Sequence, residues 1–284
     1  LAVEPTANNY ITITAAISRA VISPDINCVH VHANTYTETL FIWDAEDITL
    51  YGDGQSSTLV IGSINVGDST AIRLQDLTVR WAWGGPAWTR AVSVKASLGV
   101  SAGRVTADQS EHSGILFKDS MFGVVEGSAA RNNHHQGIDI ESSDFIRIID
   151  NTAENNGDGG IGISNHTSRC FSDTLGSGPY GCPYELNCYA GDTVGIFVAE
   201  NEVMFNAHGI HSDGAQGVQV IDNYAHDNWR NGIALQHVDS LEVSDNRAYD
   251  NGCSQVSVWQ STDGVVSRNF TNAAGRYRYT KWAN

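Results

Sequence analysis

Two pairs of ionisable residues in this chain have the types and the spacing that acid–base chemistry needs. Asp139 and Glu141 are two residues apart, and so are His211 and Asp213. Residues two apart point to the same side of a β-strand, so each pair presents both side chains to one face. A face with carboxylates and an imidazole can both remove and supply a proton. His135, four residues before Asp139, is a further candidate base.

A repeat of 23 residues puts these pairs in equivalent positions. Glycine followed by isoleucine recurs with this period at residues 114, 137 and 160, and again at 209 and 232. Within each repeat the apolar residues alternate, which is the period-2 pattern of a strand. Short strands at this period, without helical patterns between them, predict a parallel β-helix. The 49-residue gap between Gly160 and Gly209 predicts one long inserted loop, about residues 165–192.

The N-terminal segment fits the same architecture. Ile13, Ala16, Ile17, Ala20 and Val21 follow helical spacing, and Thr12 or Thr14 can cap a helix over about residues 12–22. Such a helix would cover the open end of the first coil.

The segments that follow carry a resemblance to a known group of proteins. VHVHANTYTETLFI and ITLYGDGQSSTLVIG resemble the opening of right-handed parallel β-helix proteins of the pectate-lyase-like group. The repeats resemble those of alginate lyases, mannuronan C5-epimerases and polygalacturonases. The resemblance implies an all-β fold: a right-handed parallel β-helix over residues 1–284, in one domain. It does not imply one activity, because the group includes lyases, epimerases, hydrolases, esterases and phage spikes.

Aligned repeats predict which side chains stack on the outer face, about 4.8 Å apart on successive coils. One outward column contains Lys95, Lys118, Glu141, Ser164, Asp213, Gln236 and Trp259. Its neighbour contains Ser93, Leu116, Asp139, Gly162, His211, Ala234 and Ser257. Because two of the chain's three lysines share a column with acidic groups, we interpret this face as a substrate groove. The small residues Gly162 and Ser164 are expected to form its pocket.

The predicted groove has the groups that bind an acidic polysaccharide. Lys95 and Lys118 can neutralise uronate carboxylates, and Trp259 can stack on a sugar face. Four further polar residues complete the set of substrate-binding candidates: Ser164, His166, Arg230 and Gln236.

Abstraction of the C5 proton of a uronate is the first chemistry that this set favours. It needs a neutralised carboxylate, a base and an acid. The lysines can neutralise the carboxylate, or Asp139, Glu141 and Asp213 can hold a Ca²⁺ that does so; no other cofactor is expected. His211 or His135 is the candidate base. Loss of the 4-linked sugar makes the enzyme a lyase, and reprotonation from the other face makes it an epimerase.

The mannuronan epimerases have a motif of the form Tyr-Gly-(Phe/Ile)-Asp-Pro-His. The similar stretch here is Gln136-Gly137-Ile138-Asp139-Ile140-Glu141. Glycine, the apolar residue and the aspartate match, whereas tyrosine and histidine are replaced. The resemblance therefore assigns a role to Asp139 alone.

Two other functions fit the same residues. Glu141 and Asp213 are two coils apart, about 9.6 Å, close to the largest carboxylate separation of inverting glycoside hydrolases, about 9.5 Å. Paired-carboxylate hydrolysis is therefore one alternative. A non-catalytic polysaccharide-binding or phage-spike-like β-helix is the other.

Composition limits the partners and the location. The formal charge of −16 disfavours a general nucleic-acid binder and attraction to anionic membranes. We expect a monomer. Three cysteines crowd into the predicted insertion, which favours a disulfide there and hence a secreted or periplasmic protein. The odd number of cysteines leaves the pairing open: Cys28, Cys170, Cys182, Cys188 and Cys253.

Overall fold

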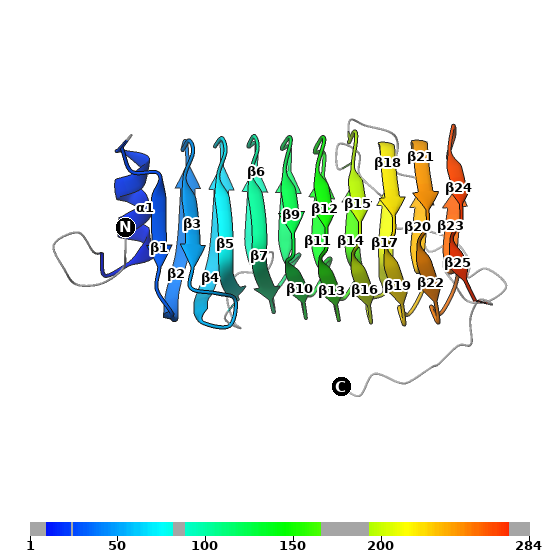
Figure 1. The fold of residues 1–284 in the computed structure, drawn as a ribbon, viewed down its shortest axis with the longest axis horizontal. Coiled ribbons are helices and arrows are strands. Elements are labelled where there is room, and N and C mark those ends of the chain that lie inside the picture. Colours follow the sequence, from blue (N-terminus) through cyan, green and yellow to red (C-terminus); the bar gives the residue numbers. More distant parts are fainter. Residues whose placement is uncertain (1–9, 24, 82–88, 166–192, 273–284) are drawn as a thin grey trace.

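The chain winds into a parallel β-helix whose coils stack along the long axis of the molecule, from the N-terminal to the C-terminal end (Figure 1). This computed structural model describes residues 10–23, 25–81, 89–165 and 193–272. All strand pairs in the described part are parallel, and each strand pairs with its equivalents on the coils before and after. The predicted all-β coil is confirmed.

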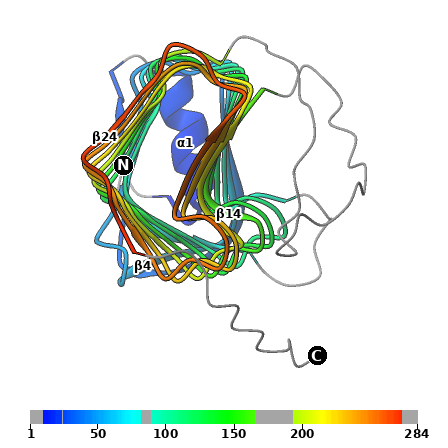
Figure 2. The same cartoon turned by 90° about the vertical axis from the view of Figure 1, so that its right-hand side faces the viewer.

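Each coil contributes to three faces that meet at corners (Figure 2). The first face is formed by the second halves of β2 (Asn34–Trp43) and β4 (Thr58–Gly67), then β6 (Val92–Lys95), β8 (Ile115–Lys118), β11 (Ile138–Glu141), β14 (Gly159–Ser164), β17 (His208–Asp213), β20 (Ile233–Gln236) and β23 (Val256–Trp259).

The second face begins with β1 (Cys28–Val31), β3 (Thr49–Gly52) and the first halves of β5 (Arg73–Arg80) and β7 (Ser101–Asp108), then β9 (Val124–Glu126), β12 (Arg147–Ile149), β15 (Phe197–Ala199), β18 (Gln216–Ile221), β21 (Asp239–Ser244) and β24 (Val265–Ser267). The third face takes the remaining halves of β2, β4, β5 and β7, then β10 (Ala129–Arg131), β13 (Thr152–Glu154), β16 (Glu202–Met204), β19 (Tyr224–His226), β22 (Arg247–Tyr249) and β25 (Phe270–Thr271).

The core is a set of inward columns, one or two residues from each strand. On the first face Ile138, Ile161, Ile210 and Ile233 stack in register and are fully buried. Burying an aliphatic side chain of this size contributes roughly 1.5–3 kcal/mol. The repeated column therefore makes every coil depend on its neighbours, as in other solenoids.

The helix α1 (Ile13–Val21) covers the open end of the first coil, as predicted for about residues 12–22 (Figure 2). Ile13, Ala16 and Ile17 point into the core. The Thr12 hydroxyl accepts the Ala15 N–H at 3.2 Å, and the Glu38 carboxylate accepts the Ile13 N–H at 3.0 Å. The hydroxyl and the carboxylate satisfy backbone donors that the first turn of a helix leaves unpaired.

Two ladders of buried asparagines hold the corners on either side of the third face. In the first, each side-chain amide except the last donates to the asparagine side-chain oxygen on the next coil at 2.9–3.0 Å: Asn151, Asn201, Asn223, Asn246 and, at the end, Asn269. The second ladder was not predicted and contains Asn133, Asn156, Asn206, Asn228 and Asn251. The ladders are structural, since their amides also donate to the backbone carbonyls of the buried residues Ile148 and Ala153.

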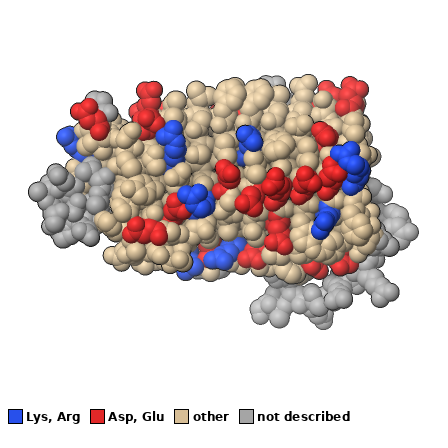
Figure 3. Space-filling model, viewed as in Figure 1, with Lys and Arg blue, Asp and Glu red and all other residues tan. Residues whose placement is uncertain are grey.

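A row of acidic side chains follows the first ladder along the outside. Asp150, Glu200, Asp222 and Asp245 each precede a ladder asparagine and have a positive φ of 55–59°, a conformation that aspartate tolerates better than most residues. Figure 3 shows a row of acidic side chains along the side of the molecule that faces the viewer. At its end Asp245 is paired with Arg268 at 2.6 Å.

The predicted disulfide concerns residues that the structure does not describe. The structure does not describe residues 166–192, which include nearly all of the predicted insertion and with it Cys170, Cys182 and Cys188. The disulfide therefore stays a prediction.

Among the residues that the structure describes, no helix is long and apolar enough to cross a membrane.

Candidate functional site

The first face has the two outward columns that the repeats predict. Lys95 pairs with Lys118, Lys118 with Glu141, and Glu141 with Ser164. Asp213, Gln236 and Trp259 continue that column. In the neighbouring column Asp139 pairs with Gly162, and Gly162 with His211. The predicted residues of these two columns therefore lie on one face of the β-helix.

The column extends further towards the N-terminus than the sequence indicated. Lys95 pairs with Gly67 and Gly67 with Trp43. Trp43 is 53% exposed, and Trp259 at the other end is 44% exposed. Each tryptophan is four coils from Glu141, about 19 Å at the usual strand spacing. Aromatic side chains therefore flank the site at both ends.

Asp139 is a strongly perturbed carboxyl of this face. The side chain is outward by register, yet only 3% of the residue is exposed. Burial, followed by repulsion from Glu141, raises the pKa of Asp139 to about 7. The Ser113 hydroxyl opposes this shift, because it donates to Oδ2 of Asp139 at 2.6 Å. At neutral pH this carboxyl is poised between its two protonation states.

A chain of polar side chains leads away from Asp139. Nδ1 of His112 lies 2.9 Å from Oγ of Ser113, and the His112 ring stacks on His135 with centroids 4.2 Å apart. Burial is the main cause that lowers the pKa of His112 to about 4. Nδ1 of His135 lies 2.8 Å from Asp158, and this hydrogen bond raises the pKa of His135. His112 is therefore neutral, and His135 favours its charged form.

Glu141 is buried beside two cations. Nζ of Lys118 lies 2.8 Å from Oε2 of Glu141, and Arg90 approaches Oε1 at 3.9 Å. Glu141 is 5% exposed. Lys118 is thus already paired with a carboxylate of the same column.

Arg90 and Ser113 were missed as site residues, although the periodicity contained the signal. Each lies two positions before the first inward residue of its strand, and so does Gln136. The three residues form a third column beside Asp139, with Ser113 and Gln136 in contact at 3.5 Å.

The pocket expected at Gly162 is occupied by side chains from neighbouring coils. An added Cβ on Gly162 would lie 2.8 Å from Cγ of Gln136 and 3.1 Å from Cε1 of His211. The His211 ring also lies against Gly159. Because Gly162 has no side chain, the His211 imidazole lies against β14, the strand between its own strand β17 and the strand β11 that carries Asp139.

The remaining predicted residues lie around this centre. Oδ1 of Asp213 lies 2.9 Å from Nδ1 of His237. Arg230 lies outside the groove columns, with Nη1 3.4 Å from Nε2 of His208. Ser164 is half-buried, and His166 lies outside the described residues.

The carboxylates predicted to bind Ca²⁺ are not gathered. Among the described residues the one group with three ligand atoms within 4.8 Å of one another lies elsewhere. Asp139, Glu141 and Asp213 instead contact Ser113, Lys118 and His237. The calcium site remains an untested prediction.

Most of the chain matches a known protein family. A family model described as a right-handed β-helix region matches residues 42–173 and 187–277. The chain belongs to the right-handed β-helix family. No curated protein matches it.

Solved structures similar to this β-helix include several proteins that act on carbohydrates. The A-module of mannuronan C-5 epimerase AlgE6 from Azotobacter vinelandii is 18% identical, with 92% of this chain and 94% of that chain covered and a TM-score of 0.53. The A-module of mannuronan C-5 epimerase AlgE4 from the same organism is 16% identical, with 93% of each chain covered and a TM-score of 0.51. The catalytic unit of a GH87 α-1,3-glucanase from Streptomyces thermodiastaticus is 14% identical, with 85% of this chain and 52% of that chain covered and a TM-score of 0.59. At these identities the likeness shows the fold.

Replacing Gly162 with alanine is expected to lower turnover of the acidic polysaccharide that the sequence predicts as substrate by about 100-fold. A displacement of about 1 Å in the side chains of a site can have this effect. The added methyl group would push His211 and Gln136 out of place. Gly103→Ala is the matched control, because a Cβ there meets Gln75 at an ordinary 3.9 Å. Steady-state rates on acidic polysaccharides test this; equal rates for both variants would contradict it.

Proposed function

We propose that this β-helix is a carbohydrate-active enzyme that removes the C5 proton of a uronate in an acidic polysaccharide. The observation that carries the proposal is the buried Asp139, whose pKa is raised to about 7. A carboxyl in this state is suited to proton transfer at neutral pH, and strongly perturbed carboxyls in grooves are frequent at active sites. The folds of the similar epimerase modules support the choice of substrate class.

In this proposal Asp139 is the base. Ionised Asp139 takes the C5 proton, while Arg90 and Lys118 stabilise the uronate carboxylate as negative charge develops on it. Lys95, one coil from Lys118, holds the carboxylate of an adjacent sugar. His135, bound to Asp158, is better suited to remain charged than to act as the base.

His211 is the proposed acid. It lies two coils from Asp139 and leans over the intervening Gly162, so a sugar ring lying along the groove would have Asp139 and His211 on different sides. Protonation of the leaving 4-oxygen by His211 completes a β-elimination. Protonation of C5 from the opposite face completes an epimerisation.

Hydrolysis by paired carboxylates is the second candidate. Glu141 and Asp213 occupy one column two coils apart, about 9.6 Å, which is close to the inverting arrangement. In that reaction one carboxyl of the pair must be protonated, and neutral Asp139, two residues from Glu141 on β11, would supply that proton. The two mechanisms therefore predict opposite pH dependence: kcat/KM rises through about pH 7 for a base and falls for an acid.

Mass spectrometry of products from a panel of acidic polysaccharides, with and without Ca²⁺, tests the proposal. Fragments one water lighter than hydrolysis products indicate β-elimination. Unchanged chain length with deuterium uptake from heavy water indicates epimerisation. Fully hydrated fragments support the hydrolase instead, and binding without turnover or uptake supports a carbohydrate-binding protein.

Ser113→Ala is expected to move the rising limb of kcat/KM to higher pH by roughly one unit. The Ser113 hydroxyl lowers the pKa of Asp139, so its removal raises that pKa and delays ionisation of the base. Ser101→Ala, on the second face, is the control. An unshifted profile in Ser113→Ala would mean that the limb does not report Asp139.

We also propose a secreted or periplasmic location. Three of the five cysteines lie within residues 170–188, and dense cysteines in one loop are typical of proteins from oxidising compartments.

A further inference from the structure

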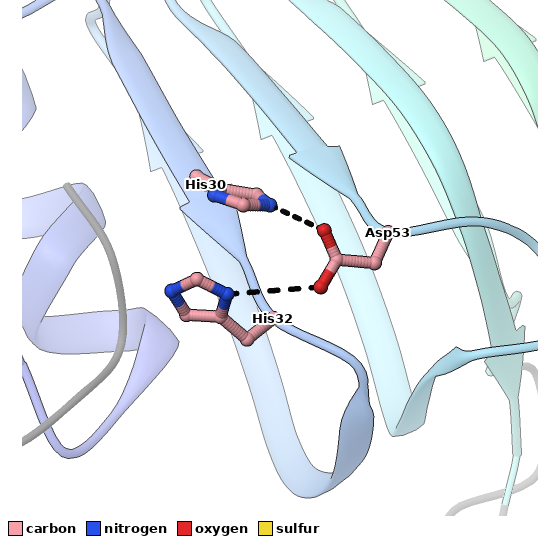
Figure 4. Close-up of side chains that lie close together, drawn as sticks. All are labelled: His30, His32 and Asp53. Carbon is pink, nitrogen blue, oxygen red and sulfur yellow. Dashed lines mark hydrogen bonds and ion pairs between the residues drawn. The ribbon is translucent and has the colours of Figure 1, made fainter.

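A cluster of metal-binding side chains lies at the N-terminal end of the second face, away from the two columns of the candidate site (Figure 4). His30 is on β1, His32 follows that strand, and Asp53 follows β3 on the next coil. Nε2 of His30 lies 2.6 Å from Oδ1 of Asp53, and Nδ1 of His32 lies 3.6 Å from Oδ2. All three ligand atoms lie within 4.8 Å of one another.

The backbone and the neighbouring side chains hold this cluster in place. His30 pairs with Tyr51 across the two coils, and their rings stack with centroids 4.6 Å apart and planes within 5°. The Ala33 N–H donates to Oδ2 of Asp53 at 2.7 Å. The Asp53 N–H donates to the Thr58 hydroxyl at 2.9 Å. Supporting contacts of this kind orient ligands around a metal ion.

The donor set selects the kind of ion. Two imidazole nitrogens and one carboxylate suit Zn²⁺ and neighbouring transition metals, whereas Ca²⁺ and Mg²⁺ prefer oxygen ligands. Ligands about 2.0–2.1 Å from a tetrahedral zinc are about 3.4 Å apart. The His32–Asp53 distance is already close to this value, and the His30–Asp53 pair needs to open by less than about 1 Å.

We propose that His30 Nε2, His32 Nδ1 and the Asp53 carboxylate bind one Zn²⁺, with water as the fourth ligand. Zinc takes the place of the proton shared by His30 and Asp53. The three side chains are 27%, 33% and 36% exposed, so an ion reaches them from solvent. Because the ligands come from the first two coils, bound zinc links β1 to β3 and stabilises the end of the β-helix beneath α1.

Zinc titration of the full chain, without a polyhistidine tag and after chelator treatment, tests this. The wild type is expected to bind one Zn²⁺, measured by competition with a chromophoric chelator, and an excess of Ca²⁺ is expected not to displace it. His30→Gln, His32→Gln and Asp53→Asn are each expected to weaken zinc binding more than about tenfold. In metal sites generally, changing a residue that only supports a ligand weakens metal binding by about 10–100-fold.

The matched control is His226→Gln. His226 also lies between two carboxylates, Asp227 at 2.8 Å and Glu202 at 3.4 Å, but these are not among the described groups with three clustered ligand atoms. This variant is expected to bind zinc as the wild type does. Zinc should also raise the Tm of the wild type and of His226→Gln.

Absence of zinc binding by the wild type would overturn the proposal, and so would unchanged affinity in the three ligand variants. Where a ligand variant fails to fold, Co²⁺ bound to the wild type provides a second measurement. A tetrahedral visible spectrum supports the site, and a weak octahedral spectrum contradicts it.

Discussion

Asp139→Asn is expected to lower turnover of the polysaccharide by about 10²–10⁴-fold, the usual contribution of one acid–base group. The amide matches the carboxyl in shape and still accepts the Ser113 hydrogen bond, but it cannot take a proton. Steady-state rates at pH 8, where wild-type Asp139 is mostly ionised, measure the effect. Glu126→Gln, on the second face and exposed, is the control and should keep full activity.

Loss of folding is not expected to explain this loss of activity. The folded pKa of Asp139 lies above the value near 4 of an unfolded chain. The stabilisation from its neutral form is therefore complete below about pH 4 and is lost as the pH rises through about 7. At pH 8 the neutral asparagine should make the variant at least as stable as the wild type, by thermal melts. Wild-type turnover by Asp139→Asn would refute its role as the base.

The second large effect concerns stability. Asn201→Ala is expected to lower the free energy of unfolding by roughly 3–5 kcal/mol, because it leaves several buried groups without partners. The Asn201 amide donates to Asn223 and to the carbonyls of Ile148 and Ala199, and its oxygen accepts from Asn151, all at 2.8–2.9 Å. Urea unfolding measures the loss.

Asn34→Ala, in an exposed position on β2, serves as the comparison and should change stability by less than about 0.5 kcal/mol. Hydrogen exchange adds a local test, since coils interact mainly with their neighbours. Protection in Asn201→Ala should fall first around β15 and β16. A loss below 1 kcal/mol would mean that the ladder contributes little to stability.

Much of the fold and the stacking of the candidate site followed from the sequence alone. Coils of constant length align equivalent residues automatically, so the 23-residue period was enough to put Asp139 beside Glu141 and opposite Gly162. A constant period does not align equivalent residues where coil length varies. Leu40 pairs with Ile64 and Ile64 with Val92, spacings of 24 and 28 residues, and Trp43 was therefore not recognised as part of the column.

Only the tertiary structure decided the chemistry of those residues. Periodicity indicates which side of a strand a side chain takes, but not how much water reaches it. Besides burial, groups from neighbouring coils shift the pKa of Asp139: Arg90 lies two coils away, and the hydrogen bond from Ser113 crosses from one coil to the next. His30 and His32 meet Asp53 in the same way, since the first two coils bring together residues more than 20 positions apart. Solvent exclusion and contacts between coils depend on the packed chain, and a linear pattern does not specify them.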